Sequence, residues 1–465
     1  MLCINILLWR NEERKFFMMK KSMIKKLLIV SGVLLVFFFG EIALTFSDKG
    51  YPFIIENEEV AFSLKLENEF SNMPETAYFD KIVNSFIKKW GINGASVAVT
   101  NDEELIYAKG FGFADKENKE EVIPGHLFRI ASVSKLITAV AIMKLYEEGE
   151  LSLDEKVFGP DGILNTDLFP DYKDPRYEKI KVRHLLNHTS GWSRRGGDPM
   201  FASLYIARKM DIEPPLNVDH IIDYALSRKL YYEPGTRYSY SNLGYAILGR
   251  VIEEKSGLPY EDFVMMNVLK PIGIHDMHLG RSYQHQKFPN EVKYYATGKT
   301  QHAYSIDGSG EHVPIYYGGN NIELLGAAGG WVSSAPELIK FLTAVDGFSA
   351  QPDILKEETI QMMTDPIIAG SGLYGWRGND KRGTWWRTGY FYGSTALMVR
   401  QRDGMNWVIL LNTSTYKQSR IQSYVSGMMF SAVNRVNEWP EQDLFMVDQD
   451  HLEPINNIPV NNPKL

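Results

Sequence analysis

Ser132 and Lys135 are spaced so that a serine hydroxyl and a lysine amine lie on one face of a helix. In the stretch FRIASVSKLITAVAIMKLYEEGELSLDEKV, the apolar residues are dense enough to predict a largely buried helix from Val133 to Glu148. Residues three apart in a helix are neighbours, so the amine can reach the hydroxyl. A serine hydroxyl is a poor nucleophile at neutral pH and needs such a base to attack an acyl carbon. The pair therefore predicts acyl-transfer chemistry.

The S-x-x-K spacing alone does not single out Ser132, because it also occurs at Ser22, Ser85 and Ser414. The plain alternative is a serine that caps a helix, followed by a lysine in solvent. Burial favours the first interpretation. A lysine inside so apolar a helix must be paired or have its pKa lowered, and both outcomes suit a catalytic base.

A second candidate site lies in the sequence PGTRYSYSNLGY, which contains Tyr240 and Asn242. Their side chains point the same way if this segment is extended, because they are two residues apart. The phenol could relay a proton if a neighbouring cation lowers its pKa, and the amide could hold a substrate carbonyl. The alternative is a tyrosine in a turn, with Asn242 capping a helix that begins at Leu243.

The third candidate, TWWRTGYFYGSTALM, places Arg387 and Thr388 directly before Gly389. Glycine lets a ligand backbone lie close against a strand. Arg387 could pair with a substrate carboxylate, Thr388 could hydrogen-bond it, and a backbone N–H just past Gly389 could help to bind an oxyanion. The alternative is an edge-strand arginine in a surface salt bridge.

No metal site is predicted. His184 and His188 have the spacing of a helical zinc pair, but HLLNH lacks the glutamate of H-E-x-x-H, and no convincing third ligand follows. We interpret the segment as a helix end that turns at Gly191. Cys3 is the one cysteine among 465 residues, which excludes disulfides, thiolate zinc sites and a cysteine nucleophile in the body of the protein. The formal net charge of -7 argues against a nucleic-acid partner.

Residues 1–46 have the pattern of an export signal. Several lysines precede an apolar run from Leu27 to Gly40, which predicts either a cleaved signal peptide or a retained signal anchor. Residues 24–46 are barely long enough to span a membrane. Met19 would give a conventional signal sequence, so the segment before it is a candidate over-extended start. We expect an exported protein, periplasmic or extracellular, that is either released or anchored in the membrane by residues 24–46.

Strand patterns lie near both ends of the body and helical patterns lie between them. Two hairpins are predicted, residues 94–113 and residues 395–412, with a helix before the first at 77–90 and a helix after the second at 418–435. This predicts an α+β fold in which the two ends of the chain close one antiparallel sheet. Further helices are expected at 180–187, 218–230, 243–256, 260–268 and 333–346, the last with a capping box at Ser334, and a long irregular segment at 280–319.

Together the three motifs resemble the serine β-lactamase-related family, which includes class C β-lactamases, D,D-carboxypeptidases, D-aminopeptidases and esterases. FRIASVSKLITA resembles the family's first motif, YSN its Y-x-N motif and RTG its K-T-G or H-T-G motif. The resemblance covers roughly residues 77–435. It implies a β-lactamase/transpeptidase-like fold, an antiparallel sheet flanked by helices plus a helical region. A hydrolase domain at 76–440 would then follow a linker at 47–75 and precede a C-terminal tail at 441–465.

The resemblance also implies a role for each residue of the first two motifs. Ser132 would be acylated, Lys135 and Tyr240 would act as base and proton shuttle, and Asn242 would orient the substrate amide. A water would then release the acyl group, so no cofactor is implied.

The third motif would bind the substrate. Arg387 and Thr388 would receive a carboxylate or another polar group, and the backbone N–H groups of Ser132 and Tyr390, beside Gly389, would form the oxyanion hole. Arg387 stands where the family usually has Lys or His. It keeps the positive charge but cannot give up its proton, which argues against potent β-lactamase activity.

We therefore expect a serine hydrolase that acts through an acyl-enzyme on a small-molecule or peptide substrate, at an amide or ester bond. One alternative is a D,D-carboxypeptidase or β-lactamase that acts on cell-wall peptides or β-lactams. An alternative of another class is a penicillin- or peptidoglycan-binding sensor that is acylated without turnover. The substrate, the deacylating base and the oligomeric state stay open.

Overall fold

The structure is a computed structural model that describes residues 66–365 and 372–446. These residues belong to one compact unit, Val60–Leu465. The predicted signal or anchor at 1–46, and most of the predicted linker and tail, lie outside the described residues. Within 66–365 and 372–446, none of the helices combines the length and the apolar character needed to cross a membrane.

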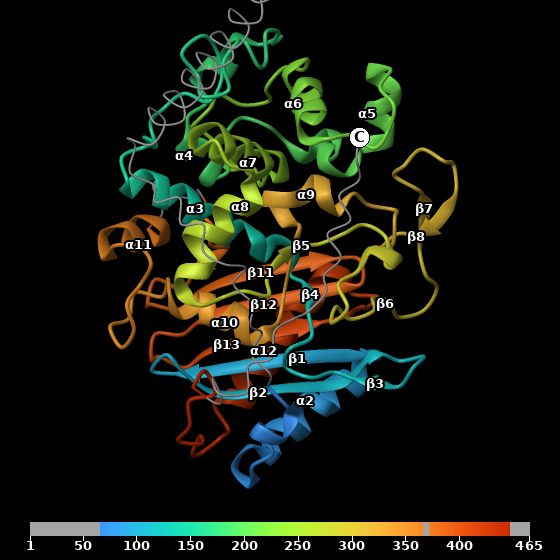
Figure 1. The fold of residues 1–465 in the computed structure, drawn as a ribbon, viewed down its shortest axis with the longest axis vertical. Coiled ribbons are helices and arrows are strands. Elements are labelled where there is room, and N and C mark those ends of the chain that lie inside the picture. The colour runs from blue at the N-terminus through green and yellow to red at the C-terminus, as the bar shows by residue number, and fades with distance from the viewer. Residues whose placement is uncertain (1–65, 366–371, 447–465) are drawn as a thin grey trace, which may run out of the picture. The chain divides into compact units, whose positions relative to one another are not determined.

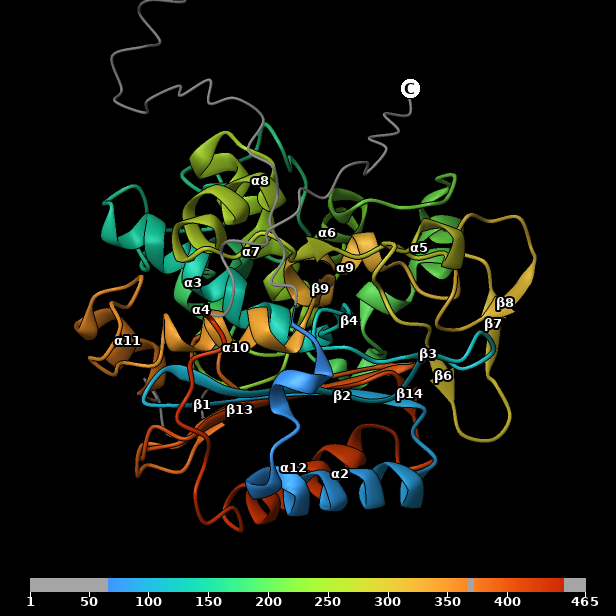
Figure 2. The same ribbon diagram turned by 60° about the horizontal axis from the view of Figure 1, so that its bottom comes forward.

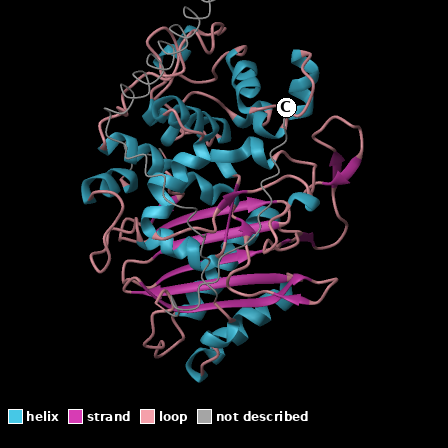
Figure 3. Ribbon diagram, viewed as in Figure 1, coloured by secondary structure: helices cyan, strands magenta, loops and turns pink. Residues whose placement is uncertain are grey.

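A seven-stranded antiparallel sheet forms the centre of this unit (Figures 1 and 3). Both predicted hairpins are present, and β13 pairs with β1, with Ala95 opposite Leu411. The prediction of a sheet closed by both ends of the chain is therefore confirmed. In spatial order the strands are β10 (Gly378–Asn379), β11 (Trp385–Phe391), β12 (Ser394–Arg400), β13 (Asn406–Leu411), β1 (Gly94–Asn101), β2 (Glu104–Asp115) and β3 (Glu120–Glu121).

Helices cover both faces of the sheet, which is why β1 is buried along nearly its whole length. On one face, α2 (Ala77–Trp90) and α12 (Ile421–Val433) pack side by side (Figure 2), and Val83, Val425 and the strand residue Val97 belong to one apolar cluster. On the other face, α10 (Ala335–Thr343) packs against β1 and β13. Ile339 and Ala98 belong to the larger core cluster on that side.

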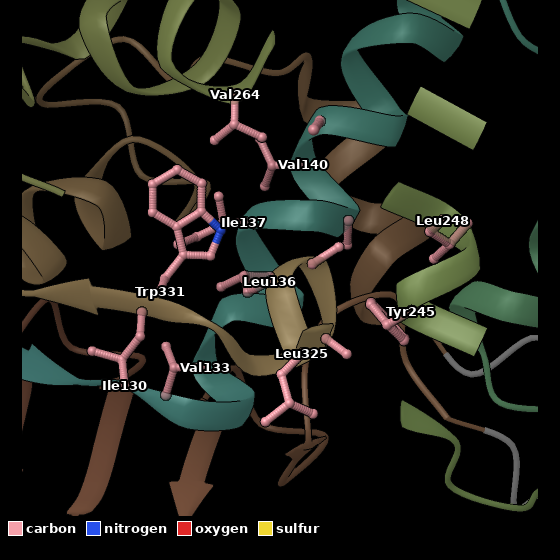
Figure 4. Packing of buried hydrophobic residues seen from close by; sticks show 14 of the residues in the cluster. Ile130, Val133, Leu136, Ile137, Val140, Tyr245, Leu248, Val264, Leu325 and Trp331 are labelled. Carbon is pink, nitrogen blue, oxygen red and sulfur yellow. The ribbon is translucent and has the colours of Figure 1, made fainter. Parts of the chain in front are cut away.

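A helical region lies beyond that second face, and α3 is at its centre. Leu136, Ile137 and Val140 of α3 pack among Trp331, Tyr245 and Val264 (Figure 4). Apolar residues on all sides of α3 fit a helix that is surrounded by protein. The helices of the region are α3 (Ser134–Glu147), α4 (Val182–Leu186), α5 (Ser203–Met210), α6 (Val218–Leu226), α7 (Asn242–Ser256), α8 (Tyr260–Val264) and α9 (Ile322–Gly329).

The remaining elements are short. The segment at 280–319 is irregular, as predicted, but it contributes three small strands. Helix α11 (Glu357–Thr364) was not predicted, and neither were α5 and α9. The short strands are β4 (Phe128–Arg129), β5 (His278–Leu279), β6 (Tyr295–Ala296), β7 (His302–Tyr304), β8 (His312–Pro314), β9 (Trp331–Ser333) and β14 (Thr413–Ser414).

The predicted capping box at Ser334 is half formed. Ser334 caps α10, because its hydroxyl accepts a hydrogen bond from the Glu337 N–H at 3.3 Å. The Glu337 carboxylate does not return to Ser334. It accepts from the backbone N–H groups of His275 and Asp276 instead, so it holds a neighbouring loop against the helix.

The described end of the predicted linker is part of the fold. Leu66 is buried, and the Ser71 hydroxyl both donates to the Ala108 carbonyl and accepts from the Ala108 N–H on β2. Residues 66–75 therefore pack on the sheet, where a free linker had been expected.

Candidate active site

Ser132 lies in a single 3-10 turn, Ala131–Val133, directly before α3. Ala131 has a φ of 49°, a left-handed conformation that is unusual for a residue other than glycine. The Ser134 hydroxyl donates to the Ala131 carbonyl at 2.7 Å and holds this turn in place. The turn places Ser132 before the N-terminus of α3, and Lys135 one turn further along, with its Nζ 3.4 Å from the Ser132 Oγ.

The Lys135 amine is fully buried, as its apolar helix predicts. Its Nζ donates to the Asn242 Oδ1 at 2.7 Å and also to the Ala328 carbonyl. Burial lowers the pKa of Lys135 because the charged form is poorly solvated, and the positive charge of Arg387 acts in the same direction.

Tyr240 is the group closest to the nucleophile, since its hydroxyl donates to the Ser132 Oγ at 2.8 Å. Burial by itself raises the pKa of this phenol, but the charges of Lys135 and Arg387 outweigh it and lower the pKa to about 8. The ring of His188 packs against Tyr240 with the centroids 4.6 Å apart. Burial keeps the pKa of His188 well below its usual value, so a neutral ring lies next to the phenol.

Asn242 is the first residue of α7, and Ser241 is the capping residue. The Ser241 hydroxyl accepts from the Gly244 N–H at 3.0 Å, so the alternative in which Asn242 caps the helix is wrong. The Asn242 Nδ2 donates to the Asp198 Oδ2 at 2.7 Å. That bond fixes the amide so that its oxygen faces Lys135. Asp198 was not predicted, and the sequence offers only a turn signal at Asp198-Pro199.

Arg387 lies behind the nucleophile and is only 1% exposed. Its Nε donates to the Ser132 carbonyl at 2.7 Å, and its NH2 lies 3.5 Å from the Tyr240 hydroxyl. The alternative of an edge-strand arginine in a surface salt bridge is wrong, because the side chain is buried and bonds the Ser132 carbonyl. β10 lies outside β11 in the sheet and pairs with it at Trp385 and Trp386. The burial of Arg387 also argues that a substrate carboxylate has to find another partner.

Gly389 allows β11 to approach the turn that carries Ser132. A Cβ at this position would lie 2.1 Å from the Ile130 carbonyl oxygen and 3.2 Å from the Ser132 nitrogen. The glycine therefore admits the protein's own backbone, where a ligand backbone had been predicted. It also places Tyr390, the next residue, beside Ser132, so the two predicted oxyanion donors belong to adjacent segments.

A cleft of about 600 Å³ opens in front of the nucleophile. Its lining includes Ser132, Tyr240, Asn242, Thr388 and Tyr390. Arg377, which the sequence did not indicate, also lines the cleft and offers a cation to a substrate. In residues 66–365 and 372–446, no group of three or more His, Cys, Asp or Glu side chains is arranged to hold a metal ion.

The sheet-and-helix architecture and these three motifs define a class of protein. The sequence model of the Beta-lactamase family matches residues 79–424, most of the described chain. The chain belongs to this family of serine hydrolases.

Individual relatives show how the family varies. Over 211 residues the chain is 33% identical to a penicillin-binding protein of Bacillus subtilis, a match that covers 45% of this chain and 42% of the relative. Over 207 residues it is 30% identical to the esterase EstB of Burkholderia gladioli, covering 43% and 50%. The matched regions thus span half or less of these two curated relatives. An octameric penicillin-binding protein homologue from Pyrococcus abyssi superposes with a TM-score of 0.57 at 25% identity, covering 76% of this chain and 77% of that one.

Proposed function

We propose that the protein is an exported serine hydrolase that cleaves an ester or amide bond through an acyl-enzyme on Ser132. The observation that carries this proposal is the 2.8 Å hydrogen bond between the Tyr240 hydroxyl and the Ser132 Oγ, beside a buried lysine. With a pKa of about 8, roughly a tenth of the Tyr240 side chains are ionised near neutral pH. A tyrosinate at this distance is a competent base for the serine hydroxyl.

In the proposed mechanism, each of these residues has a step. Tyr240 takes the proton from Ser132, and the Oγ attacks the substrate carbonyl carbon. The N–H groups of Ser132 and Tyr390 stabilise the oxyanion. As the tetrahedral intermediate collapses, Tyr240 returns the proton to the leaving oxygen or nitrogen, and the acyl group stays on Ser132. Water then attacks the acyl carbon by the same route and frees the serine.

In this scheme Lys135 contributes mainly through its positive charge, and Tyr240 is the group that exchanges a proton with Ser132. Its amine is 3.4 Å from the Ser132 Oγ, further than Tyr240, and it is held by Asn242 and the Ala328 carbonyl. It lowers the pKa of Tyr240 and fixes the Asn242 amide, which is placed to orient a substrate amide in the cleft.

The esterase and the penicillin-binding protein among the relatives support substrates with ester or amide bonds. A β-lactam or a peptide with a terminal carboxylate is the second candidate, because Arg377 and Thr388 line the cleft and could bind that carboxylate. Export is supported by the lysine-rich apolar pattern of residues 1–46. Fractionation of cells and the mass of the mature chain test that part of the proposal.

The test of catalysis uses p-nitrophenyl acetate, p-nitrophenyl butyrate and a fluorescent penicillin with the full chain. Ser132→Ala is compared with Ser419→Ala, a matched change of another serine that lines the cleft. We expect ester turnover and an acyl adduct on Ser132, both lost in Ser132→Ala and kept in Ser419→Ala. Stable penicillin labelling without turnover would indicate a sensor. Full activity in Ser132→Ala would show that the proposal is wrong.

A further inference from the structure

A second cavity adjoins the cleft on the far side of Tyr240 and Asn242. It has a volume of about 120 Å³ and shares Arg194, Tyr240 and Asn242 with the wall of the cleft that holds Ser132. A cavity of this order holds a group about the size of benzene. Any group that enters it lies next to the base and to the side chain placed to orient the substrate.

The walls of this cavity are aromatic. Trp192, Tyr205, Tyr224 and Tyr231 line it, and the rings of Tyr205 and Tyr224 meet edge to face with their centroids 6.5 Å apart. Tyr205 and Tyr231 are about half exposed, at 53% and 48%, so part of this aromatic surface is open to solvent. Such a lining favours an apolar body that carries a polar end.

Three cationic side chains line the cavity, namely Arg194, Arg228 and Lys229. The Arg228 guanidinium donates to the Tyr224 hydroxyl at 3.0 Å and lies 5.4 Å from the centre of that ring. Arg194 lies 6.0 Å from the ring of Tyr240. Within the described part of the chain, no carboxylate forms an ion pair with any of the three.

Among residues 66–365 and 372–446, Asp198 is the one acidic side chain that lines the cavity, and it is hydrogen-bonded. The Asp198 carboxylate accepts from the neutral Asn242 amide at 2.7 Å and keeps its negative charge, so it offsets one of the three cations that line the cavity. The cavity therefore combines apolar walls with an excess of positive charge. That combination attracts an anion on an apolar stem and disfavours a cation.

We propose that this cavity, which shares Tyr240 and Asn242 with the main cleft, is a substrate subsite for a carboxylate carried on a short apolar stem. The inference rests on the proposed function and adds the substrate class: acyl compounds with a second, free carboxylate. It places that carboxylate at Arg228 and Lys229, away from Arg377 and Thr388 in the main cleft.

The test compares two esters of equal length that differ in one charge, mono-p-nitrophenyl glutarate and p-nitrophenyl methyl glutarate. With the full chain, we expect the anionic ester to have a KM lower by roughly fivefold, since each exposed cation contributes modestly. The difference is expected in KM more than in kcat, because the anion is bound away from the reacting atoms. High salt should reduce it.

The double variant Arg228→Gln/Lys229→Gln should bring the two KM values together. The control Lys88→Gln/Lys89→Gln removes two exposed lysines of α2, on the opposite face of the sheet, and should leave the preference intact. Equal KM values in the unmodified protein would overturn the inference. So would a preference that survives in Arg228→Gln/Lys229→Gln and disappears in Arg377→Gln, because the carboxylate would then bind in the main cleft.

The leaving-group side is tested in the same way. 4-Carboxyphenyl butyrate and its methyl ester carry the same charge difference on the phenol. A preference that depends on Arg228 and Lys229 for this pair alone would overturn the assignment of the carboxylate to the acyl group. If none of these esters is hydrolysed in a Ser132-dependent manner, the proposed function itself fails, and that result is distinct from hydrolysis without a charge preference.

Discussion

Replacing Arg387 by glutamine should move the pH dependence of the reaction towards alkaline pH. Arg387 is buried behind Ser132 and close to the Tyr240 hydroxyl, and its charge helps to hold the pKa of Tyr240 at about 8. Glutamine removes the charge and keeps a donor for the Ser132 carbonyl. The ionised form of Tyr240 is the base in the proposed mechanism, so a higher pKa leaves less base at neutral pH.

The size of the effect follows from the shift itself. A pKa of about 8 lies two units below the usual value for tyrosine, which corresponds to about 2.7 kcal/mol in favour of the phenolate. Burial opposes this shift, so the charges of Lys135 and Arg387, together with the hydrogen bonds to Ser132 and Lys135, supply more than that amount. Lys135 contributes more than Arg387, so we take about one unit as the share of Arg387, and its loss raises the pKa of Tyr240 by about that amount. The rate near neutral pH then falls about tenfold and recovers above about pH 10.

The assay is the profile of kcat/KM against pH, measured with a p-nitrophenyl ester and with active-site concentration fixed by the acylation burst. Arg387→Lys is the matched control, because it keeps a positive charge and should keep the acidic limb near its original position. If the acidic limb of the kcat/KM profile stays in place in Arg387→Gln, or moves towards lower pH, the role given to the charge of Arg387 is refuted. A limb that moves equally in both variants would point to altered packing instead.

Other predictions concern positioning, packing and stability. Asp198→Ala should lower kcat/KM about tenfold by freeing the Asn242 amide, whereas Asp198→Asn should cost less, because it can still accept that hydrogen bond. Gly389→Ala should abolish activity and lower the melting temperature, while Gly427→Ala, in open space on α12, should stabilise by about 1 kcal/mol in denaturant titrations. Burial raises the pKa of Asp353 to about 6, so its ionisation destabilises the fold as pH rises from about 4 to above 6. Asp353→Asn should therefore raise the melting temperature at about pH 8 and leave it unchanged at about pH 4.

Local spacing explains which parts of the site the sequence could predict. Ser132 lies in the 3-10 turn before α3 and Lys135 in the first turn of α3, three residues on, and Tyr240 and Asn242 are separated by one residue, so short-range geometry was sufficient to group each pair. The contact between Asn242 and Asp198 spans 44 residues and depends on the path of a loop. No periodic pattern encodes such a path, so Asp198 could not be found in advance.

Arg387 shows the same limit for strand order. Its residue type predicted a cation near the substrate, but whether β11 is an edge or an inner strand depends on β10, a strand of only two residues. So short a strand has no alternation of apolar and polar residues that could reveal it. The hairpins β1–β2 and β12–β13 were predicted because both have long apolar strands and clear turns. Their pairing with each other followed from the assumption that both ends share one sheet.

The pairing of β13 with β1 also determines when the protein can assemble. The Gly94 N–H donates at 2.7 Å to the side chain of Asn412, 318 residues later, and Arg387 follows Ser132 by 255 residues. A chain emerging from the ribosome carries its nucleophile long before the strand that encloses it exists, and such distant pairings form slowly. A partly synthesised chain therefore contains Ser132 but lacks a complete active site. If the chain crosses a membrane before it folds, its chemistry would begin only on the far side.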